Sequence, residues 1–167
     1  MTVLVARPRS VGSWTFVIRD ASEHAETVSA IKLEGVRDSG TIRVGDIPFE
    51  IERTKMNGPY TLRFEGQPLA QAKPTGTLST AYQVIVEGAV FAQDVALGDR
   101  LTFDFAPPSL ISSSYELRLE GEKWGEIVRE SSLFRHYVLR FREGIPLAIG
   151  TFCFALVLAR LRRQSRG

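Results

Sequence analysis

The chain has 167 residues, of which 44% are hydrophobic and 24% are charged, and its formal net charge is +2 at pH 7. This composition excludes a disordered protein, and the length predicts one globular domain over residues 1–167. The small net charge argues against nucleic acid as a partner, because phosphate binding requires a concentrated basic surface.

The amino-terminal segment and the cysteine content bear on localisation. Residues 1–10 carry Arg7 and Arg9 without an uninterrupted apolar stretch behind them, so they do not resemble a secretory signal. Cys153 is the only cysteine, which excludes a disulfide within the chain and suits a reducing compartment. We therefore expect a cytoplasmic protein.

Apolar and polar residues alternate through most of the chain from residue 13 onward. Tyr60, Leu62 and Phe64 alternate with polar residues, and Leu101 and Phe103 do the same further along. Because successive side chains of a strand point to opposite faces, the pattern predicts antiparallel sheet with one buried face. The predicted strands are 13–19, 27–34, 40–45, 47–54, 60–66, 67–73, 81–87, 89–95, 100–105, 114–120, 124–130 and 135–142.

Three segments share one form, which is a tyrosine, an alternating strand and a Glu-Gly pair. They are residues 60–66, 82–88 and 115–121, and the small residues that follow them at one offset are Ala70, Ala92 and Gly125. Glycine supplies the positive φ that tight turns need, so each copy predicts a β-hairpin. The pattern fits duplication of one hairpin, and it fits a meander of similar hairpins equally well.

Residues 145–159 form the most apolar segment, which ends at Arg160. Pro146 suits the first turn of a helix, and arginines suit its carboxyl end, where unpaired carbonyls carry partial negative charge. A helix that is apolar on every side either spans a membrane or lies in a protein core. Fifteen residues reach about 22 Å, whereas a bilayer core needs about 30 Å. We favour the buried helix and keep a tail anchor over residues 145–161 as the alternative.

The strands and the helix complete one another. Twelve strands about 4.8 Å apart and tilted by about 40° close into a barrel about 24 Å across, whose lumen accommodates a helix and is too wide to stay empty. The predicted fold is therefore an all-β, twelve-stranded, antiparallel closed barrel that encloses a carboxyl-terminal hydrophobic helix over residues 145–163. Ala148 and Gly150 would let this helix approach the barrel wall, and Phe152 and Phe154 would fill the wider parts.

The chain resembles the tubby C-terminal-like fold, which tubby proteins, phospholipid scramblases and LURP-one-related proteins share. The likeness extends from about Trp14 to Arg163 and lies in strand count, hairpin style and helix position. It is closest in Gly125-Glu-Ile-Val-Arg129 and Tyr137-Val-Leu-Arg-Phe141, which lead into the apolar segment. The resemblance implies a twelve-stranded barrel around a central helix, and tubby domains bind phosphoinositides through basic residues on the barrel surface.

The sequence contains no catalytic, metal-binding or cofactor-binding constellation. Its two histidines lack ligands at metal-site spacing, and it has neither a nucleophile elbow nor a Gly-rich phosphate loop. We expect a non-enzymatic monomer without a cofactor that binds lipid headgroups, a membrane surface or a protein partner. The alternative is a single-pass, tail-anchored protein. Candidate contacts to anionic headgroups are Arg43, Arg53, Lys55, Arg63 and Lys73. Because acids lie among them, a solvated sheet face explains these residues better than a basic patch does.

Overall fold

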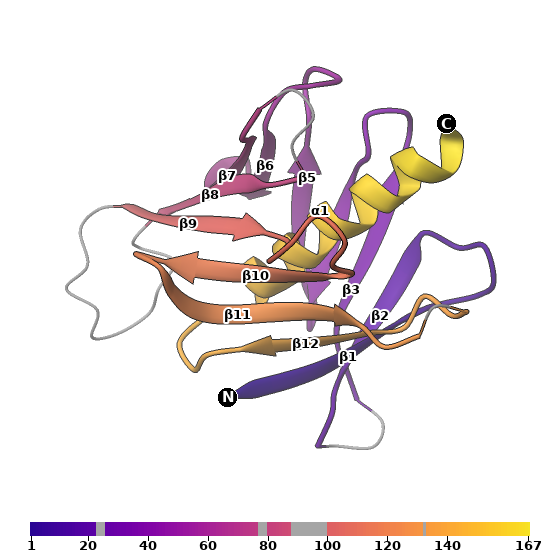
Figure 1. Cartoon of the computed structure of the whole chain (residues 1–167). Helices are drawn as coiled ribbons and strands as arrows, with labels where there is room; N and C mark the ends of the chain where they lie inside the picture. Colours follow the sequence, from indigo (N-terminus) through magenta and orange to yellow (C-terminus); the bar gives the residue numbers. More distant parts are fainter. Residues whose placement is uncertain (23–25, 77–79, 88–99, 132) are drawn as a thin grey trace.

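The computed structural model describes residues 1–22, 26–76, 80–87, 100–131 and 133–167. The helix α1 (Leu147–Arg166) follows strands that form one barrel (Figure 1). The strands are β1 (Thr2–Pro8), β2 (Thr15–Asp20), β3 (Thr27–Glu34), β4 (Ser39–Val44), β5 (Ile47–Glu52), β6 (Tyr60–Phe64), β7 (Gln67–Pro74), β8 (Tyr82–Glu87), β9 (Arg100–Ala106), β10 (Ser114–Leu119), β11 (Glu122–Arg129) and β12 (Tyr137–Phe141).

Each strand pairs antiparallel with the next one in the chain, and β1 also pairs with β12, which closes the barrel. The period-two pattern places one set of side chains inside. In β9, Leu101, Phe103 and Phe105 are buried, whereas Thr102 and Asp104 between them are exposed. The predicted all-β, twelve-stranded closed barrel is confirmed.

Strand β1 was not among the strands predicted from the sequence pattern, although it closes the barrel. Leu4 and Ala6 point inward and are buried, but Val3 and Val5 between them are apolar and half-buried on the outer face. Because apolar residues occupy both faces, the period-two signal is lost in this strand. The predicted strand 89–95 lies outside the described residues.

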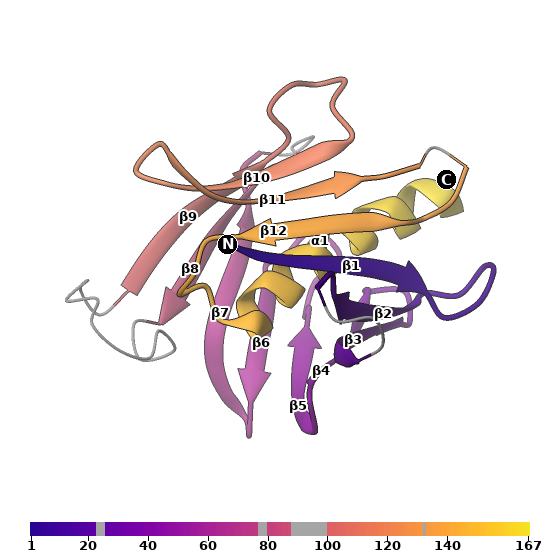
Figure 2. The ribbon, with the colours of Figure 1, turned by 90° about the horizontal axis from the view of Figure 1, so that it is seen from below.

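Helix α1 lies inside the ring of strands, as Figure 2 shows from below. All of residues 148–159 are buried, so the favoured prediction of a helix buried within the barrel is confirmed. Pro146 is the N-cap residue, one position before the helix, and the helix continues to Arg166, three residues beyond the predicted end. Within the described ranges, no helix combines the length and the apolar character that crossing a membrane requires.

Two glycines let the helix and the wall approach each other closely. A Cβ atom at Gly150 of α1 would lie 2.8 Å from the ring of Phe141, and one at Gly125 of β11 would lie 2.4 Å from the same ring. Phe141 is therefore held between the helix and the neighbouring strand. Phe154 packs edge-to-face against Phe16 of β2, with ring centroids 5.5 Å apart. The close approach expected at Gly150 is confirmed.

The barrel has two unlike ends. At the end where α1 begins, two-residue turns join β6 to β7 and β10 to β11. We call it the opposite end, because it lies opposite the carboxyl end of α1. Glu65, Gly66, Glu120 and Gly121 in these turns have φ of 49°, 78°, 50° and 81°, which is the type I′ geometry that suits the twist of a hairpin. The hairpins predicted from residues 60–66 and 115–121 are thereby confirmed, whereas residue 88 of the third copy is not described.

The other end is the one at which α1 ends with Arg160, Arg162, Arg163 and Arg166, and we call it the arginine end. The loops β1–β2, β3–β4, β5–β6, β9–β10 and β11–β12 all lie at this end, because every second connection of an antiparallel meander returns to the same side.

Candidate functional site

A single carboxylate, that of Asp38, is surrounded by arginines at the arginine end. Asp38 ends the short β3–β4 loop with φ 55° and is fully buried. Its Oδ1 atom is 3.1 Å from Arg162 Nη1 and 3.5 Å from Arg166 Nη1. Its Oδ2 atom is 3.8 Å from Arg163 Nε and 4.0 Å from Arg53 Nη1. We call these four arginines and Asp38 the arginine cluster.

The arginine cluster brings together three parts of the chain that are distant in sequence. Arg53 directly follows β5, Asp38 precedes β4, and the other arginines belong to the last turns of α1. Arg162 Nη1 and Arg166 Nη2 also donate hydrogen bonds to the carbonyl of Gly35, at 3.0 and 2.9 Å. The cluster therefore fixes the end of the central helix to the β3–β4 loop.

Buried tyrosines line the inner side of the arginine cluster. The hydroxyl of Tyr82 accepts a hydrogen bond from Arg163 Nη2 at 3.2 Å, and the hydroxyl of Tyr115 accepts one from Arg160. The guanidinium of Arg53 lies over the ring of Tyr60, 4.7 Å from its centroid, within the range of a cation–π interaction. These rings form an apolar floor beneath the guanidinium groups.

Burial changes the acidity of these phenols. It raises the pKa of Tyr60 to about 12, against the smaller opposing effect of Arg163, because the phenolate would lose its hydration. Burial likewise raises the pKa of Tyr115, and the hydrogen bond from Arg160 acts in the opposite direction. At neutral pH both groups are therefore uncharged, and they add no negative charge to the cluster.

The arginine cluster has more positive charge than its own acid neutralises. Among the described residues, Asp38 is the only acidic partner of Arg53, Arg162, Arg163 and Arg166, so four cations share one carboxylate. Arg53 Nη1 and Arg162 Nε are buried and have no hydrogen-bond acceptor in the described part of the chain. Guanidinium groups bind carboxylates and phosphates through such N–H donors. Asp38 Oδ2 is likewise buried without a hydrogen-bond partner among the described residues. The cluster therefore carries a net positive charge, and its members that are open to an anion from solvent are Arg163 and Arg166.

A hollow of about 430 Å³ adjoins the last turn of α1 at the same end. Trp14, Arg129, Arg135, Tyr137 and Leu161 are among its lining residues. The guanidinium of Arg135 lies 4.7 Å from the ring centroid of Trp14 and donates a hydrogen bond to the carbonyl of Ser13 at 2.8 Å. This hollow extends the basic and aromatic character of the arginine end toward β11 and β12.

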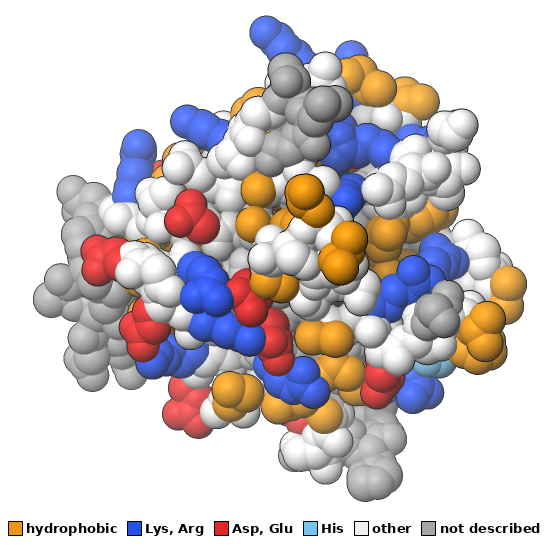
Figure 3. Space-filling view, in the orientation of Figure 1, with side chains coloured by type: hydrophobic (Ala, Val, Ile, Leu, Met, Phe, Trp, Pro, Cys, Tyr) orange, Lys and Arg blue, Asp and Glu red, His pale blue; other side chains and the backbone are white. Residues whose placement is uncertain are grey.

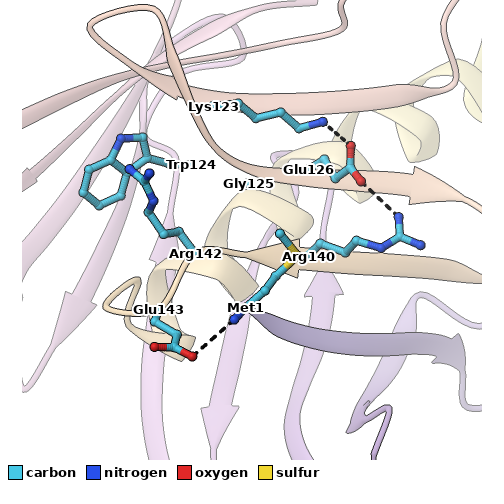
Figure 4. Close-up of a pocket in the computed structure, with 8 residues that line it drawn as sticks. All are labelled: Met1, Lys123, Trp124, Gly125, Glu126, Arg140, Arg142 and Glu143. Carbon is cyan, nitrogen blue, oxygen red and sulfur yellow. Dashed lines mark hydrogen bonds and ion pairs between the residues drawn. The ribbon is translucent and has the colours of Figure 1, made fainter.

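A larger hollow of about 650 Å³ lies on β11 and β12 toward the opposite end (Figure 4). Its charged groups are paired with one another. Glu126 accepts hydrogen bonds from Lys123 and, at 3.0 Å, from Arg140, and the amino-terminal amine lies 3.3 Å from Glu143. Lys123 also pairs with Glu116, and Arg142 pairs with Glu122, both just outside the hollow. Since every cation here has at least one carboxylate partner, this hollow offers no comparable surplus of charge.

The structure places the five predicted headgroup contacts in different surroundings. Arg53 is buried in the arginine cluster, so its side chain lies inside the barrel end and not on a solvated sheet face. Lys55 is exposed in the β5–β6 loop of the same end, and Lys73 is exposed on β7. Arg43 is exposed on β4, and Arg63 pairs with Glu52 near the opposite end. The five residues do not form one patch.

Sequence reasoning missed Asp38 and the helix arginines as partners, although one signal pointed to this end. Tyr60, Tyr82 and Tyr137 are the first residues of β6, β8 and β12, and Tyr115 is the second residue of β10. In an antiparallel meander such strands start at the same end. The repeated tyrosines therefore marked one rim of the barrel.

No family model matches this chain, and no curated protein matches it significantly.

Proposed function

We propose that this chain is a non-enzymatic protein of tubby-like architecture that binds the phosphate-bearing headgroups of an anionic membrane through its arginine end. The observation that carries the proposal is the arginine cluster, in which four guanidinium groups share the carboxylate of Asp38. The closed twelve-stranded barrel around a carboxyl-terminal helix supports the tubby-like part of the proposal.

The exposure of the arginines suits a ligand that arrives from outside. Arg53 is buried and holds Asp38 in place, whereas the side chains of Arg163 and Arg166 are 35% and 38% exposed. The inner arginine therefore organises the cluster, and the outer two can reach a phosphate at a surface. A basic side chain near an anionic membrane surface contributes about 1 kcal/mol to binding.

Vesicle co-sedimentation of the full chain tests this proposal. The probes are phosphatidylcholine vesicles with and without phosphatidylserine, at low and at high salt. We expect binding only to the anionic vesicles, with a marked loss at high salt because the attraction is electrostatic. The variant R163Q/R166Q should bind roughly 30-fold more weakly, since about 1 kcal/mol is lost per arginine.

The matched control is R100Q/R142Q, which removes two cations near the opposite end. Arg100 pairs with Glu87 and Arg142 pairs with Glu122, and the two arginine side chains are 69% and 47% exposed. This variant should bind like the wild type. Equal losses in the two variants, or equal binding to neutral vesicles, would refute the proposal. Binding of inorganic phosphate without any vesicle binding would assign the cluster to a soluble phosphate compound.

A further inference from the structure

Most of the large apolar side chains that are exposed to solvent lie at the arginine end. Among the described residues, the exposed large apolar side chains of the opposite end are those of Met1 and Ile47. The exposed apolar side chains of the arginine end lie on five loops: Val11 on β1–β2, Val36 on β3–β4, Met56 on β5–β6, Leu110 and Ile111 on β9–β10, and Leu133 and Phe134 on β11–β12.

Three of these loops expose their apolar residues almost completely. Val11 and Leu110 are fully exposed, Ile111 is 96% exposed, and Leu133 is 86% exposed. Turns normally carry Gly, Pro, Asn, Asp or Ser, so the fold itself does not require aliphatic side chains at these tips. Large apolar groups that gather on one surface mark a site of interaction.

The loops that carry these side chains have internal hydrogen bonds. In the β9–β10 loop, the amide of Ser112 donates to the carbonyl of Ser109, and the amide of Ser114 donates to Ser112 Oγ, both at 3.1 Å. In the β11–β12 loop, Ser131 Oγ accepts from the amides of Leu133 and Phe134 at 3.2 and 3.3 Å. The apolar tips are therefore presented by defined turns.

Basic side chains lie between the apolar tips. Figure 3 shows hydrophobic side chains standing out over the loops around the end of α1, with Lys and Arg side chains nearby. The charged residues in these loops and in the last turns of α1 are Arg9, Arg37, Arg53, Lys55, Arg135, Arg160, Arg162, Arg163 and Arg166, against the acids Asp38 and Glu130. A basic centre ringed by separate apolar tips complements an anionic bilayer, whose phosphates lie just above its acyl chains.

We propose that the arginine end docks end-on against an anionic phospholipid bilayer, with the apolar loop tips inserted among the acyl chains and the arginines among the phosphates. This inference rests on the proposed function and adds to it the orientation of the protein and the depth of its contact. The sides of the barrel and the opposite end then remain in water.

Site-specific labelling tests the insertion. Cys153 is fully buried in α1, and burial raises the pKa of its thiol to about 12, so it does not compete for a thiol-reactive dye. The variants I111C and I47C each carry one environment-sensitive dye, at the arginine end and at the opposite end. Ile47 is 49% exposed and serves as the matched apolar position. The probes are anionic vesicles with and without a quencher attached to the acyl chains.

We expect the dye at position 111 to shift its emission to the blue on vesicle binding and to be quenched by the acyl-chain quencher, whereas the dye at position 47 shows neither change. The variant L110S/I111S should bind at least tenfold more weakly, and its residual binding should remain salt-sensitive.

The outcomes separate the two proposals. If vesicles bind and R163Q/R166Q weakens the binding, but the dye at position 111 does not respond, insertion is refuted and headgroup binding stands. If no vesicle binds, both proposals fail. If L110S/I111S leaves lipid binding unchanged and converts a dimer into a monomer, the loop tips cover a second copy of the chain, and insertion is likewise refuted.

Discussion

The two ends of the barrel differ in charge and in the kind of ion pair they contain. The arginine end combines nine basic residues with the acids Asp38 and Glu130 in its loops and helix end. The described connections of the opposite end carry Glu26, Asp46, Glu65, Glu120 and Glu143 against Arg142 and the amino-terminal amine. A net charge of +2 therefore conceals a strongly polarised molecule.

The difference teaches that the tight turns, which set hairpin register, and the proposed binding site lie at different ends. The opposite end uses two-residue Glu-Gly turns, which set the hairpin register, and Arg63 and Arg118 donate to the carbonyls of Gly66 and Gly121 in those turns. The loops of the arginine end that join β3 to β4, β5 to β6 and β9 to β10 are longer than these two turns, and hairpin register does not require their length. Binding residues commonly lie on such loops because the scaffold tolerates changes there.

The sharpest test of this comparison is the substitution Asp38→Asn at the arginine end. The amide keeps the size of the side chain and tolerates positive φ, so the change removes mainly the charge. Arg53 is 2% exposed and would lose its counter-ion. We expect the free energy of unfolding to fall by about 3–5 kcal/mol, as for other buried pairs that lose one partner.

Urea unfolding measures this effect, and Glu130→Gln is the matched control. Glu130 is an exposed acid of the same end, so its neutralisation should change stability by no more than about 0.5 kcal/mol. If the two variants were equally stable, the carboxylate of Asp38 would not be what organises the arginines.

The barrel and its helix could be predicted from the sequence because each carries a periodic or compositional signal. Alternation identified most strands, and the uniform apolarity of residues 145–159 identified the buried helix. Strand β1 escaped because Val3 and Val5 make its outer face apolar as well. Periodicity compares the two faces of one strand, so it does not indicate a strand whose two faces are both apolar.

The arginine cluster could not be predicted in the same way, because its members meet only after the barrel closes. Asp38 and Arg162 are 124 residues apart in sequence, and nothing local to either indicates the other. Arg53 was predicted as a headgroup contact because it is one of several basic residues dispersed among acids such as Glu50 and Glu52. Its own burial depends on the three-dimensional position of the helix end, which the sequence pattern does not report.

Alkaline pH should act on the arginine end through Tyr60. Its folded-state pKa of about 12 lies above the ordinary value of 10, so the folded protein holds the phenolic proton more tightly than the unfolded chain. The contribution of Tyr60 to stability is then constant below pH 10 and falls as the pH rises from 10 to 12, because the unfolded state ionises first. Two pKa units correspond to about 2–3 kcal/mol.

The variant Tyr60→Phe sharpens this prediction. The hydroxyl of Tyr60 has no hydrogen-bond partner among the described residues, so its removal should change stability little at pH 8. Above pH 10 the variant should lose less stability than the wild type. Urea unfolding across this range, with tyrosinate absorbance followed in parallel, measures both quantities. Identical pH profiles would show that Tyr60 does not carry the alkaline sensitivity.

The smallest effect is expected from an ion pair of the opposite end, between Glu143 and the amino-terminal amine. The two groups lie 3.3 Å apart, but the glutamate side chain is 87% exposed and that of Met1 is 65% exposed. Water and salt already screen such a pair, so Glu143→Gln should leave stability within about 0.5 kcal/mol of the wild type, at low and at high salt alike. A loss as large as that of Asp38→Asn would mean that the opposite end also depends on a specific charge pair. In that case the two ends would differ in the sign of their charge only, and exposure would no longer explain which ion pairs the fold requires.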